Sequence, residues 1–131
     1  MTKKYIFGTL AFILITFVTQ STSHFLINAD HYASIPYMRS EVIFPLGFLT
    51  MTLQGLVLTY FFSLYSSSEN SLRRGIYFGL MISALFVSYL AFTESAKYQV
   101  PDIGAWILVE ASVGITQFCL YGLLMSVIFR R

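Results

Sequence analysis

The sequence predicts an all-α membrane protein, a single domain of four transmembrane helices packed as a bundle. Hydrophobic residues make up 56% of its 131 residues and charged residues only 11%, whereas about 25% is charged in soluble domains. Aromatic residues make up 18%, which suits helix ends that lie among lipid headgroups. Four apolar segments, 5–27, 42–65, 72–96 and 103–129, each reach the roughly 20 residues that a helix needs to cross a membrane.

The first segment, residues 5–27, has two interpretations. Lys3 and Lys4, the apolar run to Val18 and the small polar stretch 19–23 resemble a secretory signal peptide. Apolar residues resume at Phe25, however, and complete a spanning length. We therefore expect a permanent transmembrane helix.

The four segments are separated by three connections that carry turn and charge signals, at residues 28–41, 66–71 and 97–102. Pro45 falls in the first turn of segment 42–65, where its missing N–H removes no helical hydrogen bond. Gly75, Gly79 and Ser83 form a small-residue face on segment 72–96. We expect this face to seat a neighbouring helix of the same bundle rather than a second copy of the chain.

Positively charged residues predict the orientation, because cytoplasmic loops carry an excess of lysine and arginine. With a cytoplasmic N-terminus, the outer side holds only Arg39 and Lys97, and the inner side holds Lys3, Lys4, Arg73, Arg74, Arg130 and Arg131. Both termini are therefore expected in the cytoplasm. A short chain without an organelle signal favours the bacterial inner membrane.

Each predicted helix carries polar or small residues at helical spacing, and lipid cannot satisfy polar groups, so these faces should point into the bundle. The inward sets are Thr9, Thr16, Gln20, Ser23 and His24; Gly47, Thr50, Met51 and Gln54; Ser83, Glu94 and Lys97; and Glu110, Gly114, Gln117 and Tyr121.

Glu110 is the ionisable residue placed deepest, about 10 Å below the outer end of its helix. An ionised carboxylate facing lipid costs about 3 kcal/mol, so Glu110 needs a partner or water. The inward residues predict a funnel with charged groups near its outer mouth and amides near the midplane. Its candidate binding residues are Glu110, Glu94, Gln54, Gln117, Gln20, His24, His31, Glu41 and Lys97.

Each of these residues also has a purely structural interpretation. Glu94 and Lys97 could be an anchoring pair at a helix end. Glu110 could hold its helix to a neighbour, and Gln54 and Gln117 could join helices by hydrogen bonds.

Several other classes of function lack support. A zinc site would draw on His24, His31, Glu41 and Glu94, but no HxxxH or HExxH spacing fixes two ligands together, and we expect no metal or cofactor. The sequence has no GxSxG motif, which would indicate a nucleophilic enzyme. A proton relay through His31, Glu41 and Glu110 is an alternative that the sequence leaves open. The single cysteine, Cys119, allows no internal disulfide, and a net charge of +2 without a basic patch argues against nucleic acid.

Two hypotheses follow for a protein whose first partner is the lipid bilayer. One is an outward-facing polar pocket that binds or transports a small polar or cationic solute or a lipid headgroup. The alternative is a non-catalytic accessory or assembly subunit, packed into a larger membrane complex or a homodimer. An intramembrane enzyme has only the carboxylates and histidines in its favour, so the sequence favours a non-enzyme.

Overall fold

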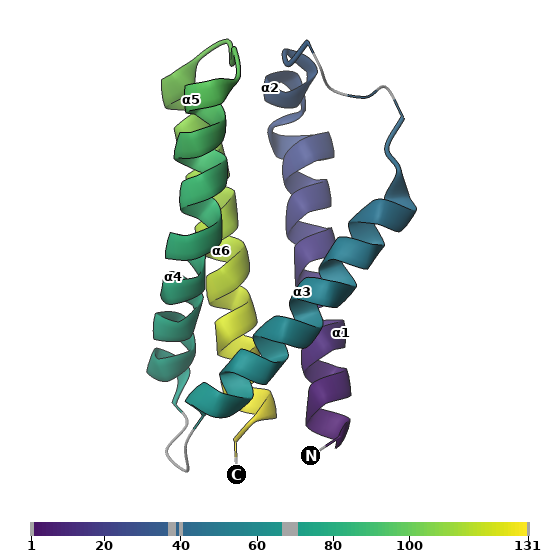
Figure 1. Ribbon diagram of the computed structural model, residues 1–131, viewed down its shortest axis with the longest axis vertical. Coiled ribbons are helices and arrows are strands. Elements are labelled where there is room, and N and C mark those ends of the chain that lie inside the picture. The colour runs from purple at the N-terminus through teal and green to yellow at the C-terminus, as the bar shows by residue number, and fades with distance from the viewer. Residues whose placement is uncertain (1, 37–38, 40, 67–70, 131) are drawn as a thin grey trace.

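The computed structural model describes residues 2–36, 39, 41–66 and 71–130, and these form helices and no strand. Four apolar helices are long enough to cross a membrane, at Thr2–Ile27, Phe44–Tyr65, Leu72–Lys97 and Ile103–Ile128. The all-α, four-helix prediction is confirmed. The first residues of Thr2–Ile27 and Leu72–Lys97 and the last residues of Phe44–Tyr65 and Ile103–Ile128 lie at one end of the bundle, here called the terminal end (Figure 1).

Two of the four helices contain a wider, π-helical turn. The chain runs through α1 (Thr2–Thr22), the π-turn η1 (Ser23–Ile27), α2 (Ala29–Ala33) and α3 (Phe44–Tyr65). It continues through α4 (Leu72–Ser88), the π-turn η2 (Tyr89–Glu94), α5 (Ser95–Lys97) and α6 (Ile103–Ile128). The short helix α2 lies in a connection where the sequence predicted none. Glu69, Asn70 and Arg131 lie outside the described residues.

The helix ends follow from local chemistry. The side chain of Ser71 accepts a hydrogen bond from the backbone N–H of Arg74 at the start of α4. Asp102 does the same for Ala105 at the start of α6, so both residues act as N-caps. Pro45 lies in the first turn of α3, as predicted.

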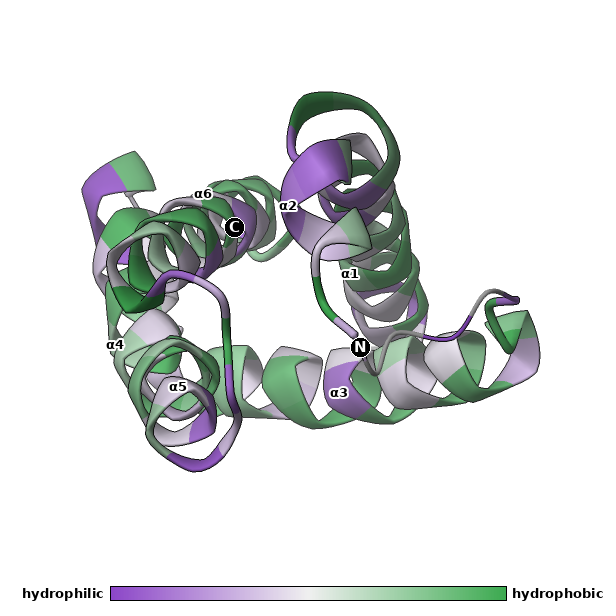
Figure 2. Ribbon diagram, turned by 90° about the horizontal axis from the view of Figure 1, so that it is seen from above, coloured by the Kyte–Doolittle hydropathy of each residue, from purple (hydrophilic) through white to green (hydrophobic). Residues whose placement is uncertain are grey.

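The outer surface of the bundle is apolar. Leu14, Leu64, Leu85 and Leu108, one from each long helix, are 62–70% exposed. Figure 2 shows that the four long helices are mainly hydrophobic, whereas α2 is largely hydrophilic. Long helices that expose apolar side chains on the outside of a bundle are stable in the hydrocarbon core of a membrane rather than in water. The chain is therefore a multi-pass membrane protein.

Helices α4 and α6 pack with their backbones in contact. A Cβ atom added to Gly75 would overlap the carbonyl group of Gly122, and one added to Gly79 would lie 2.6 Å from the Cα of Cys119. The small-residue face of α4 therefore seats α6 of the same chain, as the sequence predicted.

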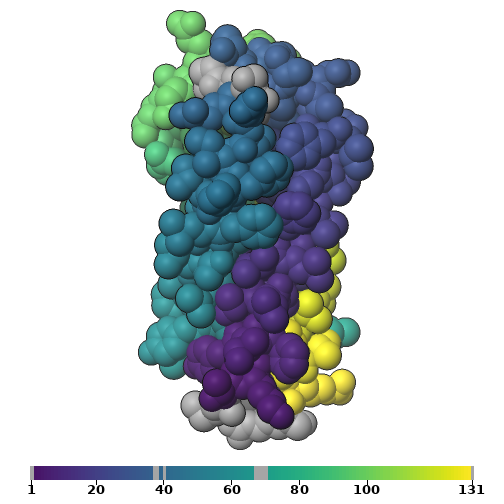
Figure 3. Space-filling model, turned by 90° about the vertical axis from the view of Figure 1, so that its right-hand side faces the viewer, coloured from purple at the N-terminus to yellow at the C-terminus, as the bar shows by residue number. Residues whose placement is uncertain are grey.

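Helix α3 is inclined across α1. Where the two helices cross, a Cβ added to Gly55 of α3 would lie 3.2 Å from the carbonyl oxygen of Thr9, and Figure 3 shows the two helices side by side. Toward its N-terminal end α3 leans away from α4 and α6 (Figure 1). The bundle is therefore closed at the terminal end and open at the end that carries α2 and α5.

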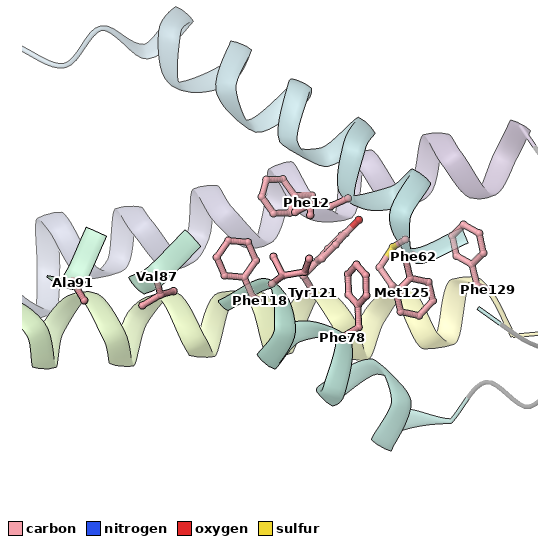
Figure 4. Packing of buried hydrophobic residues seen from close by; sticks show 11 residues of the cluster. Phe12, Phe62, Phe78, Val87, Ala91, Phe118, Tyr121, Met125 and Phe129 are labelled. Carbon is pink, nitrogen blue, oxygen red and sulfur yellow. The ribbon is translucent and has the colours of Figure 1, made fainter. Parts of the chain in front are cut away.

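The main hydrophobic core lies in the closed half (Figure 4). Phe12 of α1 and Phe62 of α3 are fully buried there beside Tyr121 of α6. The Tyr121 hydroxyl also forms a 3.0 Å hydrogen bond with the buried hydroxyl of Thr59. Because Phe12 is fully buried in this core, α1 is an integral part of the bundle.

The inclination of α3 corrects one prediction. Gly47 and Thr50 were expected to point inward, yet both are exposed, as are all residues from 41 to 50. The buried face of α3 instead consists of Met51, Gly55, Leu58, Thr59 and Phe62. Residues before Met51 lie beyond the crossing point, so their helical spacing no longer buries them. Phe48 still stacks on Phe17 of α1 there, with ring centroids 5.7 Å apart.

Candidate functional site

A polar cavity of about 790 Å³ lies at the open end of the bundle. We call it the polar pocket. Its lining residues come from α1, η1, α2, η2, α6 and the segments that follow α2 and α5, and they are Gln20, His24, Tyr32, Ile35, Leu90, Glu94, Tyr98, Trp106 and Glu110. Four of the nine residues predicted to bind, Gln20, His24, Glu94 and Glu110, therefore meet around one cavity.

Glu110 is held by a tyrosine from α2. The Tyr32 hydroxyl donates a hydrogen bond to Oε1 of Glu110 over 2.8 Å. Burial raises the pKa of Tyr32, and the negative charge of Glu110 raises it further. The phenol therefore stays protonated and donates to the carboxylate, whose second oxygen accepts no hydrogen bond from the described residues.

His24 forms a second wall of the polar pocket. Its ring stacks on the ring of Tyr32, with centroids 3.7 Å apart and planes 11° apart. Its Nδ1 lies 3.0 Å from the backbone carbonyl oxygen of Gln20, which can only accept. Nδ1 therefore carries the proton in neutral His24, and Nε2 is the ring nitrogen left to meet a ligand.

Both π-turns border the polar pocket. His24 lies in η1, and Leu90 and Glu94 lie in η2. The indole N–H of Trp106 donates to the carbonyl oxygen of Leu90 over 2.9 Å, which ties the first turn of α6 to η2. Wider turns of this kind are frequent at functional sites because they turn side chains away from the regular helical face.

The walls of the polar pocket carry acidic side chains. Glu94 and Glu110 both line it, and none of the described lysine or arginine residues does. Lys97 is three residues from Glu94, but its amino group lies 5.3 Å from the ring centre of Tyr89 instead. Of the two interpretations of Glu94, the ion pair at a helix end is therefore not formed in this structure.

A network of amides closes the polar pocket on its inner side. Nε2 of Gln20 donates to Oε1 of Gln117 over 2.7 Å, and Nε2 of Gln117 donates to the Thr16 hydroxyl over 3.0 Å. Gln117 is 4% exposed and does not line the cavity. Its amide thus joins α1 to α6, which is the structural role that the sequence left open for it.

The other predicted residues lie outside the polar pocket. Gln54 is half-buried on α3, and Glu41 is exposed before that helix begins. His31 packs against Trp106, with ring centroids 5.8 Å apart, and its buried Nε2 has no hydrogen-bond partner among the described residues. Within the described part of the chain, no three His, Cys, Asp or Glu side chains are placed to hold a metal ion.

Sequence reasoning missed the aromatic part of the polar pocket. Tyr32, Tyr98 and Trp106 all line it. They lie in or next to the connections, where aromatic residues are expected at the membrane interface for general reasons. The signal that could have found Tyr32 is its position beside two histidines within nine residues, at 24 and 31.

An apolar groove of about 450 Å³ adjoins the polar pocket. We call it the α1–α3 groove. It shares Gln20 and His24 with the polar pocket, and its other lining residues are Thr16, Phe17, Ser21, Phe25, Val42, Phe44, Gly47, Phe48, Thr50, Met51 and Gln54. A further apolar cavity lies between α3 and α4 and shares Gln54 with the α1–α3 groove.

The chain matches no protein-family model, no curated protein and no solved structure. Its function has to be argued from the site itself.

Proposed function

We propose that this protein binds a small organic cation, as a free solute or as a lipid headgroup, in the polar pocket. The observation that carries the proposal is the pairing of Glu94 and Glu110 on one cavity that no described lysine or arginine lines. Two carboxylates near hydrocarbon are costly, and a bound cation offsets that cost. Transport of the cation would use the same site.

The aromatic walls support a cation rather than a neutral polar solute. Tyr32, Tyr98 and Trp106 line the same cavity as the carboxylates. Organic ammonium groups bind such surfaces through the negative face of the ring. Glu110 would contact the cation with its second oxygen, while its first remains bonded to Tyr32. A cavity of about 790 Å³ is large enough for a drug-sized molecule.

We also propose that the polar pocket opens to the outside of a bacterial inner membrane. The described positive residues at the terminal end include Lys3, Lys4, Arg73 and Arg130, and the opposite end has Arg39 and Lys97. Since cytoplasmic segments carry the excess of positive charge, the terminal end would be cytoplasmic and the polar pocket external.

An accessory role in a larger membrane complex is the second candidate. It draws on the N-terminal part of α3 and the three residues before it, since every residue from 41 to 50 is exposed. A partner helix could cover this part of α3, whereas the cation proposal requires no partner. Native mass spectrometry from mild detergent separates the two, because it shows a bound small molecule or a bound protein directly.

The cation proposal can be tested through Trp106, the only tryptophan of the chain. Choline, tetraethylammonium and spermidine are titrated onto the protein in nanodiscs while Trp106 fluorescence is recorded. The uncharged isostere of choline, 3,3-dimethylbutan-1-ol, serves as the ligand control. We expect at least one cation to bind saturably and the isostere to bind much more weakly.

Substitutions of single carboxylates then show which of them contact the bound cation. Glu110→Gln and Glu94→Gln should each weaken cation binding about tenfold or more, because a charged contact contributes about 1.5–3 kcal/mol. Glu41→Gln removes an exposed carboxylate outside the polar pocket and should leave binding unchanged. Absence of binding by all three cations, or equal affinity in wild type and Glu110→Gln, would refute the proposal.

A further inference from the structure

We propose that the cation bound in the polar pocket is the head of an amphiphile whose hydrocarbon chain lies in the α1–α3 groove. This inference rests on the proposed cation site and specifies its ligand class. It assigns one occupant, a lipid or lipid-like molecule with a cationic head, to two cavities that adjoin.

The first argument is continuity. Gln20 and His24 line both the polar pocket and the α1–α3 groove. A ligand whose head contacts Glu110 therefore needs to pass only these two side chains to place a chain between α1 and α3. The lining changes along this path from carboxylates and a histidine to Phe17, Phe44 and Phe48.

The second argument is the inclination of α3. In its first two turns this helix has no buried residue, although it faces α1 across the groove. Gly47 lines the groove, and a Cβ added there would meet no heavy atom within 4 Å. The groove therefore has apolar walls and unfilled space, which would accommodate a flexible hydrocarbon chain.

The third argument is the distribution of charge. The described residues that line the α1–α3 groove include no Asp, Glu, Lys or Arg, whereas two carboxylates line the polar pocket. An amphiphile with a cationic head matches both cavities at once. A fully hydrophilic cation would occupy only the polar pocket and leave the groove to bulk lipid.

The test compares choline with dodecyltrimethylammonium, which has the same trimethylammonium head on a long chain and is used below its micellar concentration. Trp106 fluorescence reports the affinity of each in nanodiscs. The decisive variant is Gly47→Phe, which places a ring in the α1–α3 groove without touching the polar pocket. Leu46→Phe adds a ring one residue away, at an exposed position outside the groove, and is the matched control.

We expect Gly47→Phe to weaken dodecyltrimethylammonium binding about tenfold while choline affinity changes less than twofold, and Leu46→Phe to alter neither. A chain carrying a photoreactive diazirine should crosslink within residues 16–25 and 42–54, which line the groove. Equal loss for both ligands, no loss for either, or crosslinks spread over α4 and α6 would overturn the inference. If choline still binds to wild type in those cases, the cation site is retained and only the assignment of the α1–α3 groove fails. If no cation binds to wild type, the proposed function itself fails.

Discussion

The hydroxyl of Tyr32 and Oε1 of Glu110 lie 2.8 Å apart, although the two residues are 78 positions apart in the sequence. This bond attaches the short helix α2 to the second turn of α6. It also keeps a protonated phenol beside a carboxylate, so the pKa of Tyr32 is higher in the folded chain than in the unfolded chain.

The raised pKa of Tyr32 predicts how stability depends on pH. A raised pKa means that the folded state keeps a proton that the unfolded state loses above about pH 10. This contribution is therefore fully present below about pH 10 and is lost as the pH rises through the folded pKa. Thermal melts in detergent between neutral and strongly alkaline pH should show a steeper loss for wild type than for Tyr32→Phe. Parallel curves would contradict this assignment.

The contact between α4 and α6 predicts that adding a single methyl group at the contact lowers the stability of the protein. Gly75→Ala places a methyl group on the backbone of Gly122, and we expect a loss of about 1–3 kcal/mol in the free energy of unfolding because the helices must separate. Gly47→Ala is the matched control, since its methyl group meets nothing within 4 Å. The control should be neutral or slightly stabilising, as alanine favours helix. Equal melting temperatures for the two variants would count against the contact.

The amide network predicts energetic coupling between α1 and α6. A double-mutant cycle on Gln20→Ala and Gln117→Ala should give a coupling of about 0.6 kcal/mol and at most about 1.7 kcal/mol, the average and the maximum for hydrogen bonds between membrane helices. Steric trapping or detergent unfolding measures it. The same cycle on Gln54 and Gln117 should give none, because Gln54 lies on α3 and forms no bond with Gln117. Coupling of equal size in both cycles would assign the effect to something other than this network.

Orientation can be tested directly with reporter fusions. Fusions after Arg131 and within residues 66–70 should be cytoplasmic, because these positions belong to the end with more positive charge. Fusions near Asp30 and Tyr98 should be external. An external signal from residues 66–70 would invert the proposed orientation and place the polar pocket on the cytoplasmic side.

The number and limits of the spans followed from the sequence because length and hydropathy alone decide them. The predicted limits 72–96 and 103–129 differ from Leu72–Lys97 and Ile103–Ile128 by one residue each. The small-residue face on α4 could also be predicted from the sequence. Gly75 and Gly79 are four residues apart and so lie on one side of the helix, where small residues allow backbone contact.

The polar pocket was only partly predictable. Helical spacing placed Gln20, His24, Glu94 and Glu110 on inward faces, and the structure brings these four around one cavity. Spacing assumes regular helices that run side by side, and here α3 is inclined and two π-turns change the direction of the side chains. Tyr32 escaped notice because α2, a five-residue helix, carries no periodic signal of its own.

The bond between Gln20 and Gln117 joins residues that are 97 positions apart, and this separation has a consequence for synthesis. At about 5–20 residues per second, α1 emerges from the ribosome roughly 5–20 s before α6 exists. During that interval the Gln20 amide and the Thr16 hydroxyl have no α6 partner in the membrane. A chain stopped before residue 110 should therefore be cleared faster in a pulse-chase experiment than one stopped after residue 128. Helix α6 completes the hydrogen bonding of α1, so this part of the bundle matures only after α6 has been made.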